Sequence, residues 1–498
     1  MPRQRNLLLW ALWAALAVVA YRAAAAALYR SGFPLDDAWI HQTYARNLAA
    51  GLGWVYRPPD FGRGGVTAPL WVLLLALGHR LGLSPGLWVS LWGWVLLTAL
   101  AVLAASWPGL TGRWRMVAAL AMLGEWHLVW AAVSGMETLA FTLAISVGLW
   151  ALTHSRPRWG WATSALIVGL WLRPEALVLM PLALLRAWST RAWIEKRWWL
   201  FLLGVGAAGF AYVAFHVALT GGWGPTTGLA KTHEYAILRR TPWLWRWLRI
   251  WTPVLVGPAI LAVGGVLLWG GLGLKHARRA RLPKDGSHEA NATSLWPIIL
   301  YPLLHTGLYA WQLPVTYQHG RYIMPILPSI ILLGVLAWRD ILNRLHGTNR
   351  ARFTFALASL SILWSGGFLI LGARAYAWDV AFIESEMVTS AQWIAEHIPP
   401  SDVIAAHDIG ALGYYAPQPL ADLAGLLDPT VIPIIRDEAA LARYLQARNA
   451  KYLMTFPSWY PNLTRCSQPL FTTHAPFAPA LGGENMVVYA WQPCPASR

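Results

Sequence analysis

Two adjacent carboxylates, Asp36 and Asp37, are the residues of this sequence best suited to acid–base chemistry. They stand in the run Phe-Pro-Leu-Asp-Asp-Ala-Trp-Ile, shortly after the first long apolar segment. Because neighbouring carboxylates repel each other, one of them should have a raised pKa, which suits a general base that works near neutral pH. Alternatively, one acid caps a helix that runs to Ala50, where the helix dipole would lower its pKa. A cap needs only one acid, so the pair leaves both roles open.

Other charged and polar residues lie in surroundings that are otherwise apolar. A charge at the centre of a bilayer costs about 2.5 to 3.5 kcal/mol, and residues that bear this cost usually line a pathway or a site. Neighbouring prolines and glycines favour positions at the ends of membrane spans, where the cost is smaller. The alternatives are interfacial snorkelling and a structural Arg–Glu pair. These residues are Glu137 in Ser-Gly-Met-Glu-Thr, Arg173 and Glu175 in Leu-Arg-Pro-Glu, and His319, Arg321 and Tyr322 in Gln-His-Gly-Arg-Tyr.

The composition is that of a membrane protein, so membrane-spanning segments must position these residues. Of the 498 residues, 57% are hydrophobic and 12% are charged, whereas soluble domains have about 25% charged residues. This excludes a soluble globular enzyme, a disordered chain and a fibrous repeat. The sequence contains twelve apolar runs suited to crossing a bilayer. They are residues 6–28, 68–82, 87–106, 116–133, 136–152, 159–172, 174–186, 199–220, 248–272, 296–311, 322–338 and 354–373.

Basic residues between the runs predict which side of the membrane each loop occupies. Placing the basic clusters in the cytoplasm puts the N-terminus inside, and the first loop, 30–67, the loop 221–247 and everything after residue 375 outside. This orientation needs an odd number of passes, so residues 107–135 form either two short passes or a re-entrant pair. The loop 221–247 has cations of its own, so either the rule fails there or these cations meet an anion. The basic clusters are residues 3–5, 156–158, 186–197, 275–284 and 339–352.

The formal net charge of +17 belongs to the membrane part, since residues 378–498 contain eleven acidic and six basic residues. Lipid phosphates and the positive-inside bias explain the excess, so nucleic acid is not needed as a partner. We predict a helical membrane domain at 1–377, with about 11 to 13 transmembrane helices, and a small exported α/β domain at 378–498. Cys466 and Cys494 lie in the exported part and form either a disulfide or two free thiols.

With this orientation the outer cations, including Lys231 and His233, gather on the same side as the acid pair. Charge-assisted hydrogen bonds to an anion contribute about 1.5 to 3 kcal/mol each, so three or four could hold a lipid phosphate as a leaving group. We therefore expect chemistry on a lipid-linked phosphate at the outer interface. Phosphate-binding loops, dinucleotide fingerprints, zinc-spaced Cys/His clusters and nucleophile elbows are all missing from the sequence.

The chain resembles the GT-C superfamily of polytopic glycosyltransferases, especially its bacterial arabinofuranosyltransferase-type and mannosyltransferase-type members. The likeness extends over most of the chain. It rests on Asp36-Asp37-Ala-Trp-Ile with Thr67-Ala-Pro-Leu-Trp, and on Ser134-Gly-Met-Glu-Thr, Leu172-Arg-Pro-Glu, Ala230-Lys-Thr, Gly320-Arg-Tyr-Ile-Met-Pro, Asp408-Ile-Gly-Ala-Leu-Gly-Tyr-Tyr and Asp422-Leu-Ala-Gly-Leu-Leu-Asp-Pro. One departure is Thr67-Ala-Pro, where relatives often have a more polar residue before proline, which leaves the acceptor or the sugar open.

The resemblance implies transfer of one sugar from a polyprenyl-phosphate donor to a glycan, lipid or protein acceptor at the outer face, with inversion. A first-loop aspartate would be the general base, with Asp36 the better match and Asp37 close behind. No metal or other cofactor is firmly expected; a divalent metal is possible but not favoured. The resemblance assigns Arg46, Lys231, His233, His319, Arg321 and Tyr322 to the donor phosphate, and Glu137, Arg173, Glu175, His407 and Asp408 to the sugar and acceptor pocket.

Two rival functions belong to other classes. A secondary transporter or a flippase for lipids or lipid-linked sugars explains spans with buried charges, but it predicts internal repeats and polar residues near the midplane, and neither is evident. A scaffold that anchors the exported domain predicts that changing both acids to asparagine has no effect. We expect a multi-pass protein of a bacterial-type plasma membrane, with Tyr414 and Asp422 as further hypothetical recognition residues in the exported domain.

Overall fold

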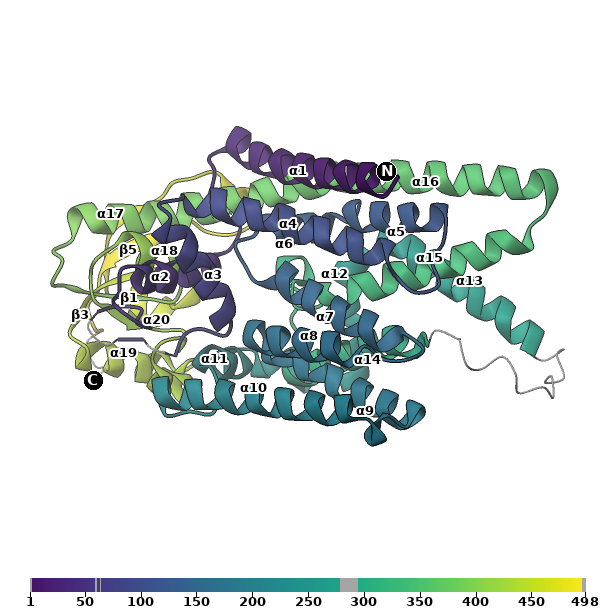
Figure 1. Ribbon diagram of the computed structural model, residues 1–498. Helices are drawn as coiled ribbons and strands as arrows, with labels where there is room; N and C mark the ends of the chain where they lie inside the picture. Colours follow the sequence, from purple (N-terminus) through teal and green to yellow (C-terminus); the bar gives the residue numbers. More distant parts are fainter. Residues whose placement is uncertain (1, 59–60, 63, 278–293, 495–498) are drawn as a thin grey trace.

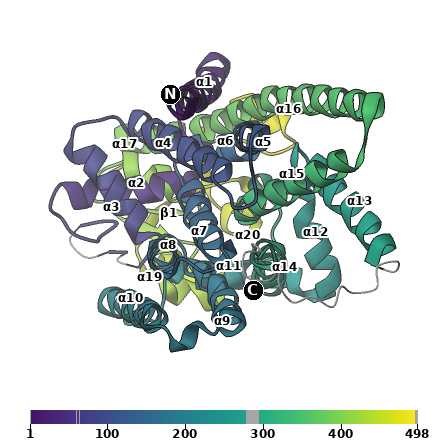
Figure 2. The ribbon, with the colours of Figure 1, turned by 45° about the vertical axis from the view of Figure 1, so that its right-hand side comes forward.

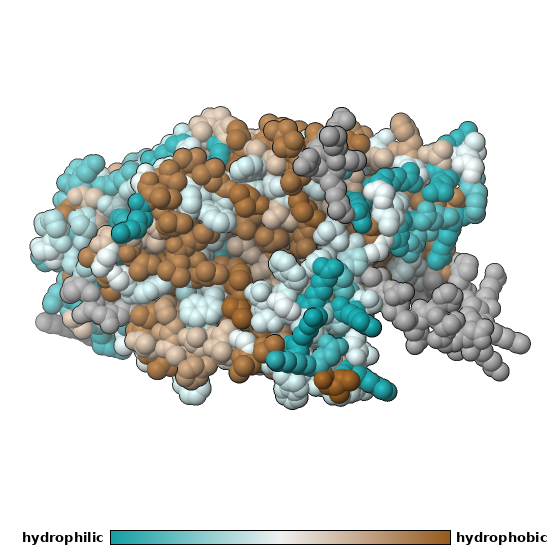
Figure 3. Space-filling view, in the orientation of Figure 1, coloured by the Kyte–Doolittle hydropathy of each residue, from teal (hydrophilic) through white to brown (hydrophobic). Residues whose placement is uncertain are grey.

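The computed structural model describes residues 2–58, 61–62, 64–277 and 294–494. The chain forms an elongated helical part with a smaller α/β part at one end (Figure 1). Most of the basic cluster 275–284 lies outside the described residues. The space-filling view shows apolar side chains over the middle of the molecule and hydrophilic ones towards both ends (Figure 3). An apolar band between two polar ends is the surface that a bilayer requires.

The helical part includes five helices that are long and apolar enough to cross a membrane, among the residues described. Four shorter apolar helices accompany them. Helices α1 and α16 lie side by side along one edge (Figures 1 and 2). The helices are α1 (Pro2–Leu28), α3 (Pro69–Arg80), α4 (Pro85–Ala105), α5 (Arg113–Leu123), α6 (Trp126–Val133), α7 (Thr138–Thr153), α8 (Trp159–Leu172), α9 (Leu179–Thr190), α10 (Lys196–Thr220), α12 (Trp243–Leu255), α13 (Ala259–Ala277), α14 (Trp296–Gln312), α15 (Leu327–Arg344) and α16 (Gly347–Ile383).

Residues 107–135 form two helices, α5 and α6, which meet at an angle of 55°. A buried acid at the break, Glu125, accepts hydrogen bonds from two backbone N–H groups. One is that of His127 in α6, and the other is that of Ala259 at the start of α13. A free backbone N–H in lipid would be costly, so this side chain allows the bend inside an apolar environment. The bent pair is therefore either one broken span or a re-entrant element.

Two short helices lie between the membrane helices and the α/β part: α2 (Asp36–Ala49) and α11 (Thr226–Glu234). Helix α2 packs against α3 and against α18 of the α/β part. The loop before α7 comes close to it, since Gly135 has φ +80° and a Cβ there would meet Phe33 and Ala38 at 2.8 and 2.9 Å. Trp71 of α3 donates its indole N–H to the Gly135 carbonyl at 2.9 Å. These contacts fix α2 on the membrane domain.

The α/β part contains a five-stranded sheet with the order β2-β1-β3-β5-β4. Strand β1 pairs in parallel with β2 and β3, and β5 pairs antiparallel with β3 and β4. Leu441, Leu445 and Leu453 are buried in its core. Its elements are α17 (Thr389–His397), β1 (Val403–Ala406), α18 (Gly410–Tyr415), β2 (Leu420–Asp422), α19 (Glu438–Ala447), β3 (Ala450–Thr455), α20 (Pro461–Thr464), β4 (Gln468–Thr472), α21 (Phe477–Ala480) and β5 (Val487–Ala490).

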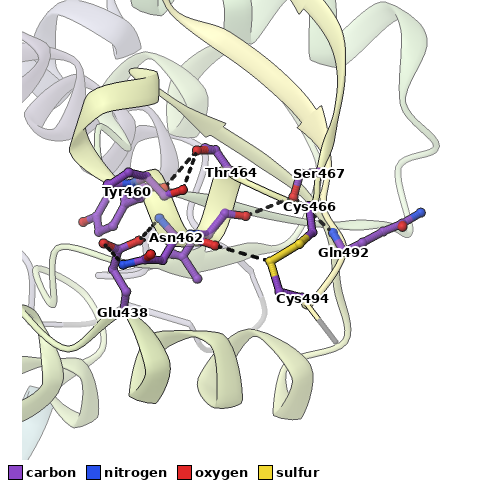
Figure 4. The surroundings of a disulfide bond; sticks show 10 residues. Glu438, Tyr460, Asn462, Thr464, Cys466, Ser467, Gln492 and Cys494 are labelled. Carbon is purple, nitrogen blue, oxygen red and sulfur yellow. Dashed lines mark hydrogen bonds between the residues drawn. A yellow bond between two sulfur atoms is a disulfide. The ribbon is translucent and has the colours of Figure 1, made fainter. Parts of the chain in front are cut away.

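A disulfide joins Cys466 to Cys494, 28 positions apart (Figure 4). It ties the segment before β4 to the segment after β5, so it closes the edge of the sheet where these two strands pair. Nearby, the Glu438 carboxylate accepts hydrogen bonds from the backbone of α20 at Asn462 N and Leu463 N.

The membrane helix α16 continues without a break across the expected domain boundary at 377/378. A π-helical turn, Glu384–Val388, then joins it to α17. This turn is tied to the end of α1, because the Arg30 guanidinium lies 2.9 Å from the buried Glu384 carboxylate. A continuous helix and a partly buried ion pair thus connect the two parts of the chain.

Candidate active site

The first turn of α2 holds both acids, and they have different partners. Asp36 accepts hydrogen bonds from Gly410 N at 2.6 Å and from Ala411 N at 2.8 Å, which are the first two residues of α18. A Cβ at Gly410 would lie 2.0 Å from the Asp36 carbonyl, so only glycine allows this approach. The N-cap position of α2 is Leu35, so neither acid occupies it. Asp36 instead connects α2 to the α/β part.

Asp37 points to cations from two distant elements. Its Oδ2 atom lies 2.8 Å from the Lys231 ammonium of α11 and also accepts a hydrogen bond from the Arg321 guanidinium. The Tyr322 hydroxyl lies between these cations, 2.9 Å from Arg321 and 3.4 Å from Lys231. Among the described residues, no N–H or O–H group donates to the other carboxylate oxygen of Asp37, Oδ1.

These partners give the two acids opposite properties. Burial raises the pKa of Asp36 to about 6, although the backbone N–H groups of Ala411 and Gly410 oppose the shift. Burial acts in the same direction on Asp37, but Lys231 and Arg321 outweigh it and hold the pKa of Asp37 well below its usual value. Asp37 is therefore ionised at any physiological pH, and its charge is balanced by the two cations.

Arg321 follows a strained turn. Three consecutive residues, 318–320, have positive φ angles of 53°, 55° and 69°. For a residue other than glycine this left-handed conformation costs about 1 to 2 kcal/mol. His319 is held by Asp379, whose Oδ2 lies 2.8 Å from the imidazole Nε2 and also accepts the indole N–H of Trp130 at 2.9 Å. His319 thus lies against α6 and α16, and the turn directs the next residue, Arg321, towards Asp37.

A small cavity of about 100 Å³ borders Asp37 on the membrane-domain side. Arg173 lines this cavity. Its guanidinium donates hydrogen bonds to Glu137 at 2.8 Å, to Glu175 at 3.1 Å and to the Tyr309 hydroxyl at 2.9 Å. Tyr309 in turn donates to Glu175. The Arg–Glu pair that the sequence left open is therefore present, and it lines a cavity at the same time.

A larger cavity of about 600 Å³ lies between α11 and the α/β part. The expected residues His407 and Asp408 line it, together with groups that the sequence analysis did not select. His407 is oriented by the Tyr460 hydroxyl, 2.7 Å from Nδ1, and by Glu234, 3.7 Å from Nε2. Glu234 follows His233 directly, in the Lys-Thr-His-Glu run, but Arg436, Trp459 and Tyr460 come from segments of the α/β part without any recognisable motif. The lining residues that the sequence did not indicate include Glu234, Tyr235, Tyr317, Arg436, Glu438, Trp459 and Tyr460.

Five of the expected residues line neither cavity: Arg46, His233, His319, Tyr414 and Asp422. The side chain of Arg46 donates hydrogen bonds to the carbonyl groups of Tyr414 and Gly413, and its guanidinium lies 4.8 Å from the Tyr414 ring centroid. His233 is exposed on α11. Asp422 is buried and accepts hydrogen bonds from three backbone N–H groups of the loop that follows it. Asp36, Asp37, Lys231, Arg321 and Tyr322 are thus gathered at one place, whereas Arg46 and Tyr414 join α2 to α18.

No group of three or more His, Cys, Asp or Glu side chains suited to holding a metal ion occurs in the described part of the chain.

Residues 378–489 match a family described as a domain of unknown function (DUF8728). No curated protein sequence matches the chain.

Solved structures of two other proteins share the fold. ArnT from Cupriavidus metallidurans bound to undecaprenyl phosphate is 15% identical, with a TM-score of 0.57, and the match covers 96% of this chain and 97% of that chain. The apo state of the same protein is 16% identical with a TM-score of 0.54 and the same coverage. The apo oligosaccharyltransferase from Archaeoglobus fulgidus is 12% identical with a TM-score of 0.53, over 90% of this chain and 69% of that chain.

These matches span both the helical and the α/β parts. They confirm the predicted fold class, a polytopic helical membrane protein with a small C-terminal α/β domain. The chain is therefore an integral membrane protein with the fold of the GT-C glycosyltransferases.

Proposed function

We propose that the protein is a membrane glycosyltransferase that transfers one sugar from a polyprenyl-phosphate donor to an acceptor hydroxyl at the outer face, with inversion at the anomeric carbon. The observation that carries this proposal is the position of Asp37, which contacts Lys231 and Arg321 and borders two cavities. The fold supports it, because ArnT shares the fold and was crystallised with undecaprenyl phosphate.

Lys231 and Arg321 are suited to binding the donor phosphate. Arg321 is only 2% exposed, and the two cations already share one anionic oxygen, that of Asp37. Charge-assisted hydrogen bonds to phosphate contribute about 1.5 to 3 kcal/mol each, and they would stabilise the charge that develops as the phosphate leaves. The small cavity beside them, with Arg173, Glu137 and Glu175, would then accept the sugar ring.

Asp37 is the group that we assign as general base, and Asp36 is a positioning residue. A phosphate anion competes with Asp37 for Lys231 and Arg321, so donor binding weakens the ion pairs of Asp37 and increases its basicity. Its Oδ1 then accepts the proton of the acceptor hydroxyl. As that oxygen bonds to the anomeric carbon, the bond from this carbon to the phosphate oxygen breaks, and the phosphate leaves with the electron pair.

The test is to incubate the purified full-length protein with a panel of radiolabelled polyprenyl-phosphate sugars, with and without membrane glycolipids as acceptors. We expect at least one donor to be consumed, by transfer or by slow hydrolysis, with release of polyprenyl phosphate. A transporter or flippase would move the donor across a vesicle membrane and return it intact. Recovery of every donor unchanged, together with translocation, would overturn the proposal.

A further inference from the structure

The larger cavity differs in chemistry from the donor side, although Asp37 and Lys231 border both. Because Asp37 lines both cavities, an acceptor that approaches its carboxylate from the α/β part passes through the larger cavity. From its lining, and resting on the proposed function, we propose that this cavity binds the acceptor as a neutral or positively charged sugar residue and rejects acceptors that bear a phosphate or carboxylate group.

The lining has an excess of acidic groups. Its two permanent cations are outnumbered by five acidic side chains: Lys231 pairs with Asp37, and Arg436 donates to the Glu234 backbone carbonyl at 2.8 Å. Burial lowers the pKa of His407 to about 4, so the imidazole is neutral at physiological pH. The five lining carboxylates are those of Asp36, Asp37, Glu234, Asp408 and Glu438.

Asp408 reports the electrostatic potential inside the cavity. Burial raises its pKa, and the charges of Asp36 and Asp37 raise it further, to well above the ordinary value for aspartate. An environment that resists a negative charge on Asp408 would equally resist a phosphate in its place. A hydroxyl or an ammonium group, by contrast, could donate hydrogen bonds to Asp408 and Glu234.

The rest of the wall suits a sugar ring. Trp459, which is 47% exposed, lies with Tyr235 and Tyr317 on the lining, and Leu426 and Ile435 add apolar surface. A pyranose or furanose has apolar C–H faces and a rim of hydroxyl groups, so it matches aromatic walls with a few carboxylate acceptors. The volume of about 600 Å³ is within the range of small-molecule sites, about 300 to 1,000 Å³.

Binding of matched sugars to the full-length protein in detergent tests this proposal. The probes are glucose, mannose and galactose, each as methyl glycoside, 2-amino sugar and 6-phosphate, and saturation-transfer NMR gives the dissociation constants. We expect at least one methyl glycoside or amino sugar to bind about tenfold more tightly than its 6-phosphate, because unbalanced carboxylates repel the phosphate. Equal or tighter binding of the phosphates, or no binding of any neutral or amino sugar, would overturn the proposal.

Two sets of variants place the discrimination in this cavity. The double change Glu234→Gln and Asp408→Asn should reduce the ratio of the dissociation constant of a 6-phosphate to that of its neutral sugar. Trp459→Ala should weaken the binding of neutral sugars about tenfold. Glu396→Gln removes one exposed charge outside the cavity and should leave all constants unchanged. A preference that survives the double change would contradict the proposal.

The outcome of this binding experiment does not depend on whether the proposed function is correct. Consumption of a donor with water as the acceptor tests transferase chemistry alone. If a donor is consumed but 6-phosphates bind best, the acceptor class is wrong and the function stands. If no donor is consumed but the charge preference and its variants behave as described, the function is wrong, and the cavity remains a sugar-binding site.

Discussion

The Asp37 carboxylate and the Lys231 ammonium lie 2.8 Å apart, although 194 positions separate them in the chain. Arg321, which is 284 positions from Asp37, contacts the same oxygen atom. A charge cluster built from three distant segments must have every charge compensated when it is partly buried. This one has two cations for one carboxylate, so it carries a net positive charge that an incoming anion would compensate.

Removal of one of these cations should weaken donor binding. We predict that Lys231→Gln raises the dissociation constant for a polyprenyl-phosphate sugar about 10- to 100-fold, since one charge-assisted hydrogen bond is lost. Equilibrium binding of a radiolabelled donor measures the change. The matched control is Arg240→Gln, which removes an exposed charge shortly after α11. Equal donor affinity in the two variants would contradict the assignment of Lys231 to the phosphate.

Asp36 should affect stability in a pH-dependent way. Its pKa of about 6 in the folded protein exceeds its value near 4 in the unfolded chain, so the folded state holds the proton more tightly. The contribution of Asp36 to stability is therefore fully present below about pH 4 and is lost as the pH rises through 6. We predict that the difference in thermal midpoint between wild type and Asp36→Asn falls between pH 4 and pH 7. A constant difference across this range would show that Asp36 has an ordinary pKa.

The contact between α2 and α18 should tolerate no side chain at Gly410, where a Cβ would lie 2.0 Å from the Asp36 carbonyl. We predict that Gly410→Ala displaces α18 and destabilises the protein by about 1 to 3 kcal/mol, as overpacked sites do. Limited proteolysis would detect the displaced segment as faster cleavage. The matched control is Gly160→Ala, because Gly160 has open space around it. Gly482 also has open space, but its φ of +80° would strain an alanine there. If Gly410→Ala resists proteolysis as well as the wild-type protein does, the close packing at Gly410 is contradicted.

The hydrogen bond between His319 and Asp379 should keep the strained turn in place. We predict that Asp379→Asn lowers turnover about tenfold with little effect on folding, because Arg321 loses its fixed direction and a small misplacement of a binding group reduces the rate. The apparent KM for donor should rise together with the fall in kcat. Unchanged kinetic constants in this variant would mean that the turn holds Arg321 without help from Asp379.

The Cys466–Cys494 disulfide should stabilise the α/β domain. For a loop of this length the chain-entropy model gives about 3 to 4 kcal/mol. We predict that Cys466→Ser together with Cys494→Ser lowers the thermal midpoint and that wild type responds to a reductant in the same way. Alkylation under denaturing conditions, followed by mass spectrometry, checks that the two thiols are unavailable in the oxidised protein.

The sequence predicted the architecture well because hydropathy is a strong local signal. Long apolar runs and a terminal acidic segment were enough to separate helical and α/β parts, and the likeness around Asp36 and Asp37 indicated the fold. The sequence predicted two short passes or a re-entrant pair at 107–135, but not what stabilises the break, a buried acid, Glu125, that accepts a backbone N–H of another helix. Local composition does not reveal such tertiary compensation.

The roles of the two acids could not be separated from the sequence. Adjacent residues of a helix point about 100° apart, so Asp36 faces α18 while Asp37 faces Lys231 and Arg321. The resemblance made Asp36 the better match for the base, with Asp37 close behind, whereas we propose Asp37 from its contacts. The part of the cavity wall contributed by Arg436, Trp459 and Tyr460 was not predicted, because only the folded domain brings these residues to the cavity.

The most direct test of the assignment of Asp37 is the turnover of a radiolabelled polyprenyl-phosphate sugar by Asp37→Asn, measured beside Asp36→Asn. We predict that Asp37→Asn loses at least about 100-fold in rate while it still binds the donor, and that Asp36→Asn, where it folds, retains a larger share of the activity. Turnover at the wild-type rate in Asp37→Asn would contradict its role as the base.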